Sequence, residues 1–155
     1  PEANPMGLEI KEIEAKAIIS IKDSTDSDGI SEKLKELYTE LSIFMGQKNL
    51  KSAGMPLAMY YSYSPEKVVL EAALPYEGNV ESEGRIMVGN TPEGKSIVGI
   101  HYGDYDASGD MHYAIEDYAK ANNLELRNIC WEIYANDPTT VDSAEVETHI
   151  YYPIN

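Results

Sequence analysis

The chain has 155 residues, 43% of them hydrophobic, which is enough for about one domain with a core of its own. Its 27 acidic and 12 basic residues give a net charge of −15, which opposes nucleic-acid phosphates and anionic membranes and favours cationic ligands. No apolar run of membrane-spanning length appears. From this and from the acidic charge, we expect neither a membrane partner nor direct nucleic-acid binding by this chain. The single cysteine excludes an internal disulfide and suits a reducing compartment, so we expect a cytoplasmic location.

The first residues have the composition of a linker, with proline, alanine and asparagine and no apolar pattern. We expect residues 1–7 to be a linker or tail and residues 8–155 to form a single domain. That domain is either stand-alone or excised from a longer protein.

The pattern of apolar residues predicts alternating strands and helices along the chain. Runs rich in β-branched and aromatic residues predict strands over residues 8–13, 16–22, 56–63, 67–76, 85–88, 96–102, 125–134 and 144–152. The first two runs are either separate strands or one bent strand. Apolar residues at helical spacing predict helices over 30–44 and 111–121, the first stopped by Gly46.

The second half of the chain repeats the plan of the first. The stretch KAIISI, which begins at Lys16, returns as KSIVGI at Lys95, and hairpins end at Pro75 and at Pro153. We therefore predict an α+β fold: a duplicated βαββ unit with two helices on a mixed or antiparallel sheet. A groove between the halves is a natural ligand site.

The stretch Cys130-Trp131-Glu132-Ile133-Tyr134 reads as a strand with an acid at its centre. Alternation places Cys130, Glu132 and Tyr134 on one side and the other two on the opposite side. A carboxylate among apolar neighbours is expensive to bury without a partner. Two interpretations follow: an exposed Glu132 on the wet face of a sheet, or a lone acid at the floor of an aromatic pocket.

Tyrosine is the aromatic residue that this chain favours, with twelve Tyr against one Phe. A tyrosine offers a flat apolar wall and a hydroxyl, and a cationic planar ligand gains from cation–π contacts and from a nearby acid. Aligning the halves at Pro65 and Pro138 places Met59 opposite Glu132 and Tyr61 opposite Tyr134. The predicted ligand-binding residues are Met59, Tyr61, Tyr102, Tyr113, Cys130, Trp131, Glu132 and Tyr134.

The segment from Gly89 to Ser96 matches the phosphate-binding pattern G-x-x-x-x-G-K-[ST]. That chemistry requires a helix directly after the lysine, with its N-terminus aimed at phosphate. The residues after Lys95 read as a strand instead, so we interpret the segment as a hairpin turn and not as a nucleotide site.

Metal and cofactor sites are not indicated. His101, His112 and His149 lack metal-ligand spacing, and no hydrolase triad spacing appears. Cys130 has no identifiable base beside it, which favours an inert thiol over a nucleophile. We therefore predict no metal and no cofactor.

Several short motifs occur in a characteristic order from Leu8 onward. They are the apolar pattern over 10–21, Gly54-x-Pro56, Leu70-Glu71-Ala72 before Pro75, Gly103-x-Tyr105, Glu132-x-Tyr134 with Asp137-Pro138, and Glu147-Thr148 before Tyr152-Pro153. In this order and spacing, the chain resembles the GyrI-like family, the effector-binding domain attached to AraC-type and MerR-type regulators.

The resemblance implies a duplicated βαββ unit of the SHS2 type and multidrug binding. Members bind amphipathic, often cationic drugs on aromatic walls, with an acid that matches Glu132 inside the groove. Some members hydrolyse cyclopropane-containing drugs, and another shields DNA gyrase. Three functions therefore stay open: a binding module, a hydrolase of small reactive xenobiotics with Glu132 and Tyr134 as acid–base groups, and an acidic protein-interaction module. We expect the binding module, not an enzyme, with small amphipathic or cationic molecules and a fused or separate regulator domain as partners.

Overall fold

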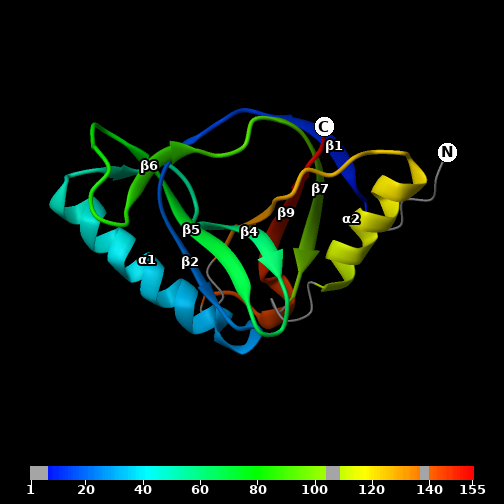
Figure 1. Ribbon diagram of the computed structural model, residues 1–155, viewed down its shortest axis with the longest axis horizontal. Helices are drawn as coiled ribbons and strands as arrows, with labels where there is room; N and C mark the ends of the chain where they lie inside the picture. The colour runs from blue at the N-terminus through cyan, green and yellow to red at the C-terminus, as the bar shows by residue number, and fades with distance from the viewer. Residues whose placement is uncertain (1–6, 104–108, 137–139) are drawn as a thin grey trace. The chain divides into compact units, whose positions relative to one another are not determined.

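The computed structural model describes residues 7–103, 109–136 and 140–155, which form two compact units (Figure 1). We call Ala15–Thr91 the first unit, and Pro92–Asn155 together with Pro1–Glu14 the second unit. Most of the expected tail lies outside the described residues, as do Tyr105, Asp137 and Pro138 of the sequence motifs. The strands of each unit form an open antiparallel sheet, and each unit has one long helix, so the predicted α+β fold is confirmed.

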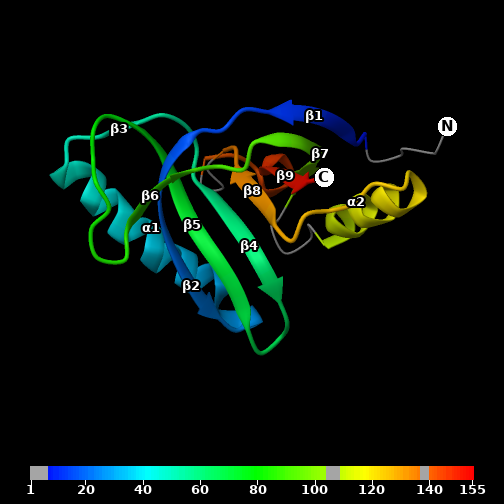
Figure 2. The ribbon, with the colours of Figure 1, turned by 45° about the horizontal axis from the view of Figure 1, so that its top comes forward.

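The first unit is a four-stranded sheet with one helix along it. Its elements are β2 (Ala17–Thr25), the short helix η1 (Ser27–Gly29), α1 (Ile30–Gln47), β3 (Lys51–Ser52), β4 (Leu57–Tyr63), β5 (Val68–Glu77) and β6 (Met87–Asn90). The strand order is β6–β2–β5–β4, with the short β3 paired to the end of β5. Figures 1 and 2 show α1 lying along β2 and β5.

The second unit has the same arrangement. Its elements are β1 (Glu9–Ile13), β7 (Gly94–Tyr102), α2 (Gly109–Ala121), β8 (Cys130–Tyr134), the short helix η3 (Ser143–Glu145) and β9 (Glu147–Pro153). The strand order is β1–β7–β9–β8, and Figure 2 shows β1 beside β7.

The two units are repeats of one strand–helix–hairpin unit, as the sequence predicts. In both, the strand before the helix pairs with the last strand of the hairpin: β2 with β5, and β7 with β9. The edge strands are exchanged, because β1 precedes β2 but pairs with β7, and β6 precedes β7 but pairs with β2. One bent strand over residues 8–22 is therefore wrong. The predicted groove between the halves stays a prediction.

Each helix buries an apolar stripe against its own sheet. In the first unit, Leu37, Leu41 and Phe44 of α1 pack with Ile19 and Ile21 of β2. Burying a side chain of this size contributes about 1.5–3 kcal/mol. Helix α1 continues through Gly46, where the sequence predicts its end, and stops at Gln47.

In the second unit, Met111 and Ile115 of α2 pack on Ile97 of β7 and Ile150 of β9. Gly99 of β7 allows this close approach, since a Cβ atom there would lie 2.5 Å from the sulfur of Met111. The apolar stripe of α2 fixes which way the rest of the helix faces, and so it positions the side chain of His112.

The segment that matches the phosphate-binding pattern runs from the end of β6 to the start of β7 and does not precede a helix. Lys95 and Ser96 belong to β7, so the strand predicted after the lysine is confirmed. The predicted hairpin turn is wrong, because β6 pairs with β2 while β7 pairs with β1 and β9. The residues after Asn90 connect the first unit to the second. The strand predicted over 125–134 is shorter in the structure, where β8 begins at Cys130. Leu126 makes only an isolated bridge to Ile154.

Candidate functional site

Strand β8 presents alternate side chains to opposite faces of its sheet. Glu132 pairs with Ile150, and Tyr134 pairs with Thr148 on β9. Ile150 belongs to the core beneath α2, so Glu132 and Tyr134 lie on the face that carries α2. Trp131 pairs with Tyr151, and their rings stack on the other face with centroids 4.2 Å apart. The alternation predicted for this strand is confirmed.

The carboxylate of Glu132 is buried, and both of its oxygens are hydrogen-bonded. Only 9% of the residue is exposed, which excludes the interpretation of an acid on a wet face. Tyr134 donates its hydroxyl to Oε1 at 3.1 Å, and Nε2 of His112 lies 2.8 Å from Oε2. The expectation of a lone acid is wrong, because α2 supplies a histidine partner.

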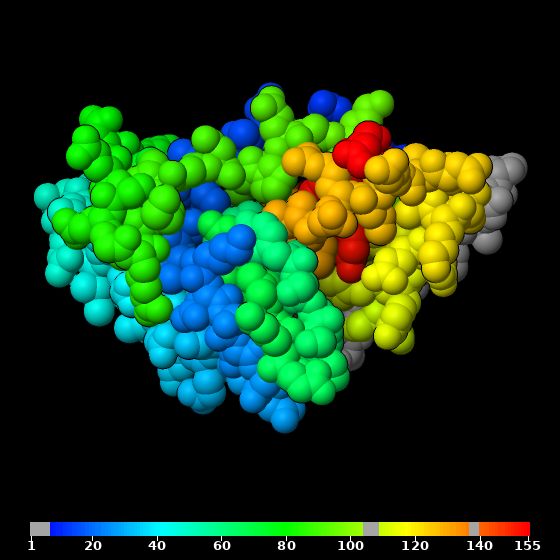
Figure 3. Space-filling model, in the orientation of Figure 1, coloured from blue at the N-terminus to red at the C-terminus, as the bar shows by residue number. Residues whose placement is uncertain are grey.

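His112 links Glu132 to a second tyrosine. Its Nδ1 atom lies 2.7 Å from the hydroxyl of Tyr152, and the two rings meet edge to face. We call Cys130, Glu132, Tyr134, His112 and Tyr152 the Glu132 cluster. Figure 3 shows the yellow surface of α2 next to the orange and red surface of the strands in the same unit.

Charge in the cluster is balanced by the histidine. Burial lowers the pKa of His112, but hydrogen bonds with Cys130 and Glu132 raise it more, to about 9. His112 is therefore an imidazolium at neutral pH, and both of its N–H groups donate, one to Glu132 and one to Tyr152. Burial also raises the pKa of Tyr152, so its hydroxyl stays protonated.

A buried ion pair with two phenols can act in two ways. As a purely structural feature, it ties α2 to β8. As a site, it offers a preformed carboxylate that an incoming cation can share or take from the imidazolium. A titratable group with a strongly shifted pKa, set among hydrogen-bonding partners, favours a functional site.

The comparisons with known proteins decide the family. The family model described as the GyrI-like small molecule binding domain matches residues 6–155. The chain belongs to the GyrI-like family. No curated protein sequence matches it.

Solved structures share the fold of this GyrI-like domain. EcmrR in a complex with DNA is 21% identical with a TM-score of 0.86, over 96% of this chain and 57% of that chain. The C-terminal domain of EcmrR is also 21% identical, with a TM-score of 0.77 and coverage of 96% of both chains. The chain therefore spans little more than half of the EcmrR chain in the DNA complex.

Two further structures have other descriptions. SAV2435 bound to tetraphenylphosphonium is 16% identical with a TM-score of 0.70, covering 97% of this chain and 94% of that one. A hydrolase encoded by lin2189 from Listeria innocua is 12% identical with a TM-score of 0.70, covering 97% and 92%. At these identities the likeness concerns the fold.

Not every predicted site residue of the GyrI-like domain joins the Glu132 cluster. Cys130 is half-buried beside His112. Tyr102 and Tyr113 are 60% and 69% exposed, and Trp131 lies on the opposite face of β8. The indole Nε1 of Trp131 is buried without a hydrogen-bond partner among the residues that the structure describes.

His112 and Tyr152 were not predicted to be site residues. The signal that points to His112 is its place on the helix, directly after Met111 and three residues before Ile115. That spacing puts it beside the buried stripe of α2, where it faces the sheet.

Met59 and Tyr61 of the first unit have a different setting. Met59 is 3% exposed and pairs with Glu71 of β5, while Tyr61 donates its hydroxyl to the same carboxylate. These side chains lie on the sheet face away from α1, whereas Glu132 and Tyr134 lie on the face that carries α2. The positions that the sequence alignment of the two halves matched, Met59 with Glu132 and Tyr61 with Tyr134, therefore do not occupy equivalent places in the two repeats.

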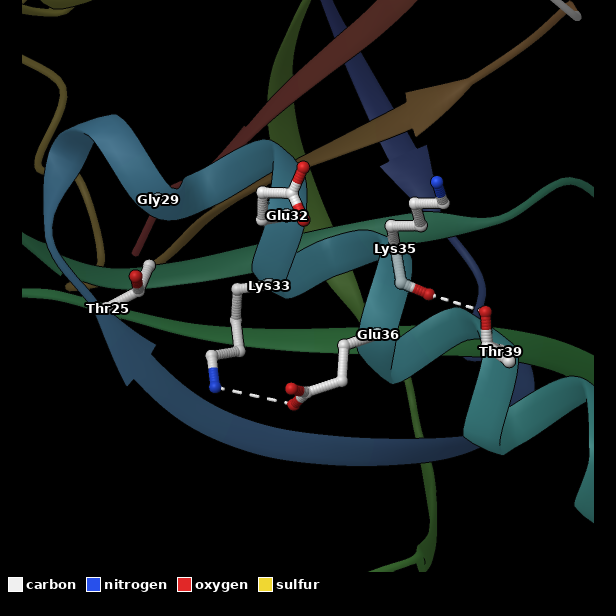
Figure 4. A pocket seen from close by; sticks show the side chains of 7 residues that line it. All are labelled: Thr25, Gly29, Glu32, Lys33, Lys35, Glu36 and Thr39. Carbon is white, nitrogen blue, oxygen red and sulfur yellow. Dashed lines mark hydrogen bonds and ion pairs between the residues drawn. The ribbon is translucent and has the colours of Figure 1, made fainter.

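Two hollows in the surface of the described residues are lined mainly by charged and polar residues and by no aromatic ones. Figure 4 shows one of about 530 Å³ along α1, where Lys33 pairs with Glu36 and Thr39 donates to the carbonyl of Lys35. Its lining is charged and polar, as expected of a solvated helix surface. In the described ranges, no group of His, Cys, Asp and Glu side chains is arranged to hold a metal ion. No helix there is both long and apolar enough to cross a membrane.

Proposed function

We propose that this GyrI-like domain binds small amphipathic molecules, cations among them, and that Glu132 is the acid they engage. The observation that carries the proposal is the buried carboxylate of Glu132, which accepts a hydrogen bond from Tyr134 and is linked through His112 to the phenol of Tyr152. The family description is that of a small-molecule-binding domain, and a relative of the same fold is bound to tetraphenylphosphonium, a lipophilic cation.

The physical basis is competition between the ligand and His112 for one carboxylate. A cation that contacts Glu132 replaces the charge of the imidazolium, and the tyrosine rings add cation–π attraction of about 0.5–2 kcal/mol. A cation that carries an N–H group also donates a charged hydrogen bond to the carboxylate, which contributes about 1.5–3 kcal/mol. Amphipathic cations should therefore bind more tightly than neutral molecules of the same outline.

The partner that we propose is a regulator domain, either fused or separate. The EcmrR chain in the DNA complex is longer than the part matched here, and a matching structure of the same protein is described as its C-terminal domain. With a net charge of −15, the present chain is unsuited to contact DNA itself. The ligand would then act by changing the state of the attached domain.

Calorimetry with tetraphenylphosphonium tests the proposal. Its neutral comparison is triphenylphosphine oxide, and the variants are Glu132→Gln and, as a control for net charge, Glu12→Gln on the exposed side of β1. We expect Glu132→Gln to lower the affinity for the cation by about 1–4 kcal/mol, because tetraphenylphosphonium has no hydrogen-bond donor and loses only its Coulomb attraction to the carboxylate. The affinity for the neutral compound should fall less. Equal weakening by both variants, or none by either, would reject Glu132 as the ligand acid.

A second function, hydrolysis, has its own supporting observation. Glu132, His112 and Tyr152 form a continuous hydrogen-bonded chain, which can move a proton to and from a bound substrate. The relative from Listeria innocua is described as a hydrolase. The resemblance to the family suggests cyclopropane-bearing substrates, with Glu132 and Tyr134 as acid–base groups.

Turnover separates the two functions. If the domain is a hydrolase, a reactive cyclopropane compound should yield product, and Glu132→Gln should abolish product while the compound still binds. A compound that is bound and recovered unchanged favours the binding module. The gyrase-protecting role rests on acidic charge alone and stays a prediction, as does the cytoplasmic location.

A further inference from the structure

The first unit contains a second carboxylate held in a fixed orientation, that of Glu71 on β5. Ser20 of β2 donates its hydroxyl to Oε2 at 2.5 Å, and Tyr61 of β4 donates to Oε1. Ser20 is 2% exposed, so this carboxylate is held from within the sheet. Glu71 itself is half-buried, and all three residues lie on the face away from α1.

Unlike Glu132, Glu71 forms no ion pair with another residue in the part of the chain that the structure describes. The ion pairs formed among the described residues all involve other carboxylates, and both partners of Glu71 are neutral hydroxyls. A carboxylate has about four lone-pair positions, and two are used here. The other lone-pair positions can accept a contact from an external group.

The nearest candidate within the chain, Lys22, is placed elsewhere. Lys22 is paired directly with Glu71 across β2 and β5, yet its ammonium lies over the ring of Tyr61, 3.9 Å from the centroid. The Tyr61 ring therefore already holds a cation on its face. Because Lys22 is an exposed, flexible side chain, it is a displaceable occupant of that position.

We propose that Glu71, Tyr61 and Ser20 form a second binding site, specific for organic cations, in which Lys22 occupies the place of the ligand. The cation lies on the Tyr61 ring, as the Lys22 ammonium does, and close to the Glu71 carboxylate. Burial and the hydrogen bond to Glu71 raise the pKa of Tyr61, so the hydroxyl stays a donor that fixes the acid. An ammonium with a flat apolar body matches the ring and the carboxylate together.

This site is independent of the Glu132 cluster, because the two carboxylates belong to different units. The two carboxylates differ in whether a positively charged side chain is already paired with them. Glu132 is neutralised by His112 and must exchange one cation for another, whereas Glu71 has no ion-pair partner among the described residues and gains one on binding. The Glu71 site should therefore bind a cation without breaking an ion pair among the described residues.

Amide NMR of the whole chain, titrated with benzyltrimethylammonium, tests the proposal. The neutral comparison is the isostere with carbon in place of nitrogen. We expect the cation to shift the amides of Ser20, Tyr61 and Glu71, and the isostere to leave them unchanged. Glu71→Gln should weaken this binding at least tenfold, while Tyr61→Leu removes the ring and should weaken it similarly.

Lys22→Met provides a gain-of-binding arm that needs no loss of a hydrogen bond. The substitution should raise the affinity for the cation several-fold. The control Lys67→Met, which removes an exposed charge from the same unit, should raise the affinity less. Glu132→Gln should leave the shifts in the first unit unchanged, which separates this site from the proposed function. Shifts confined to the second unit, or equal effects of Lys22→Met and Lys67→Met with no effect of Glu71→Gln, would overturn the proposal.

Discussion

His112 and Glu132 form a buried ion pair, with Nε2 of His112 2.8 Å from Oε2 of Glu132. They come from different elements, α2 and β8, and 20 residues separate them in the chain. The pair places the imidazolium of His112, which α2 carries, next to the carboxylate that we propose as the ligand site. If cations bind at Glu132 as we propose, then folding, ligand binding and the protonation of His112 are coupled.

The first prediction concerns stability against pH. The pKa of His112 is about 9 in the folded state against an ordinary value of 6.5. The stability that the folded state gains from the charged His112 is therefore fully present below pH 6.5 and is lost as the pH rises through 9. The loss in the free energy of unfolding should be on the order of 3 kcal/mol. Urea unfolding at several pH values should show it in the parent and not in His112→Gln. The control variant His149→Gln, which removes a histidine paired with Glu147, should keep the pH dependence of the parent. The same dependence of unfolding free energy on pH in the parent and in His112→Gln would contradict the prediction.

The affinity for a permanent cation should rise with pH. The groups that face His112 are Cys130, Glu132 and Tyr134 from β8 and Tyr152 from β9, with Glu116 nearby on α2. As His112 loses its proton, the carboxylate of Glu132 is released to the ligand, so tetraphenylphosphonium should gain at most about tenfold per pH unit between 7 and 9. His112→Asn should bind it with little dependence on pH. A flat profile in the parent would show that the cation does not compete with His112.

Substitution of Gly99 should loosen the helix that carries His112. A Cβ atom there would lie 2.5 Å from the Met111 sulfur and 3.0 Å from a methyl carbon of Leu8, both buried. Gly99→Ala should destabilise the fold by about 1–3 kcal/mol, as overpacking does. The matched control is Gly89→Ala on β6, where a Cβ atom meets nothing within 4 Å. Similar unfolding midpoints for the two variants would contradict this account of how α2 is seated.

The phosphate-binding pattern should be without consequence for nucleotides. Lys95 lies within β7, and no helix N-terminus follows it to hold a phosphate. Lys95→Ala should therefore leave the melting temperature in ATP and magnesium unchanged relative to the parent. A stabilisation by ATP in the parent that disappears in the variant would overturn this interpretation.

Local patterns predict the elements well where one face is apolar. The stripe of Leu37, Leu41 and Phe44 indicates α1, and alternation in β8 places Glu132 and Tyr134 together. Gly46 does not end α1, because a glycine inside a helix costs only about 1 kcal/mol and packing outweighs it. The ends of elements depend on such balances, and the sequence does not show them directly.

The partners of the acids could not be predicted in the same way. His112 meets Glu132 only because the packing of Met111 and Ile115 on β7 and β9 turns that side of α2 toward β8. Glu71 meets Ser20 and Tyr61 through the register of neighbouring strands, which a bulge between Tyr60 and Ser62 shifts. The sequence shows that His112 faces the sheet, but the side chains that these residues meet are set by long-range packing.

The most direct test of the central claim is a crystal structure of the domain with tetraphenylphosphonium. Our account predicts the phosphonium within about 6 Å of the Glu132 carboxylate or of the Tyr134 ring, the range of cation–π contacts, with His112 displaced from Oε2. A cation bound elsewhere, with the pair of His112 and Glu132 intact at 2.8 Å, would contradict it.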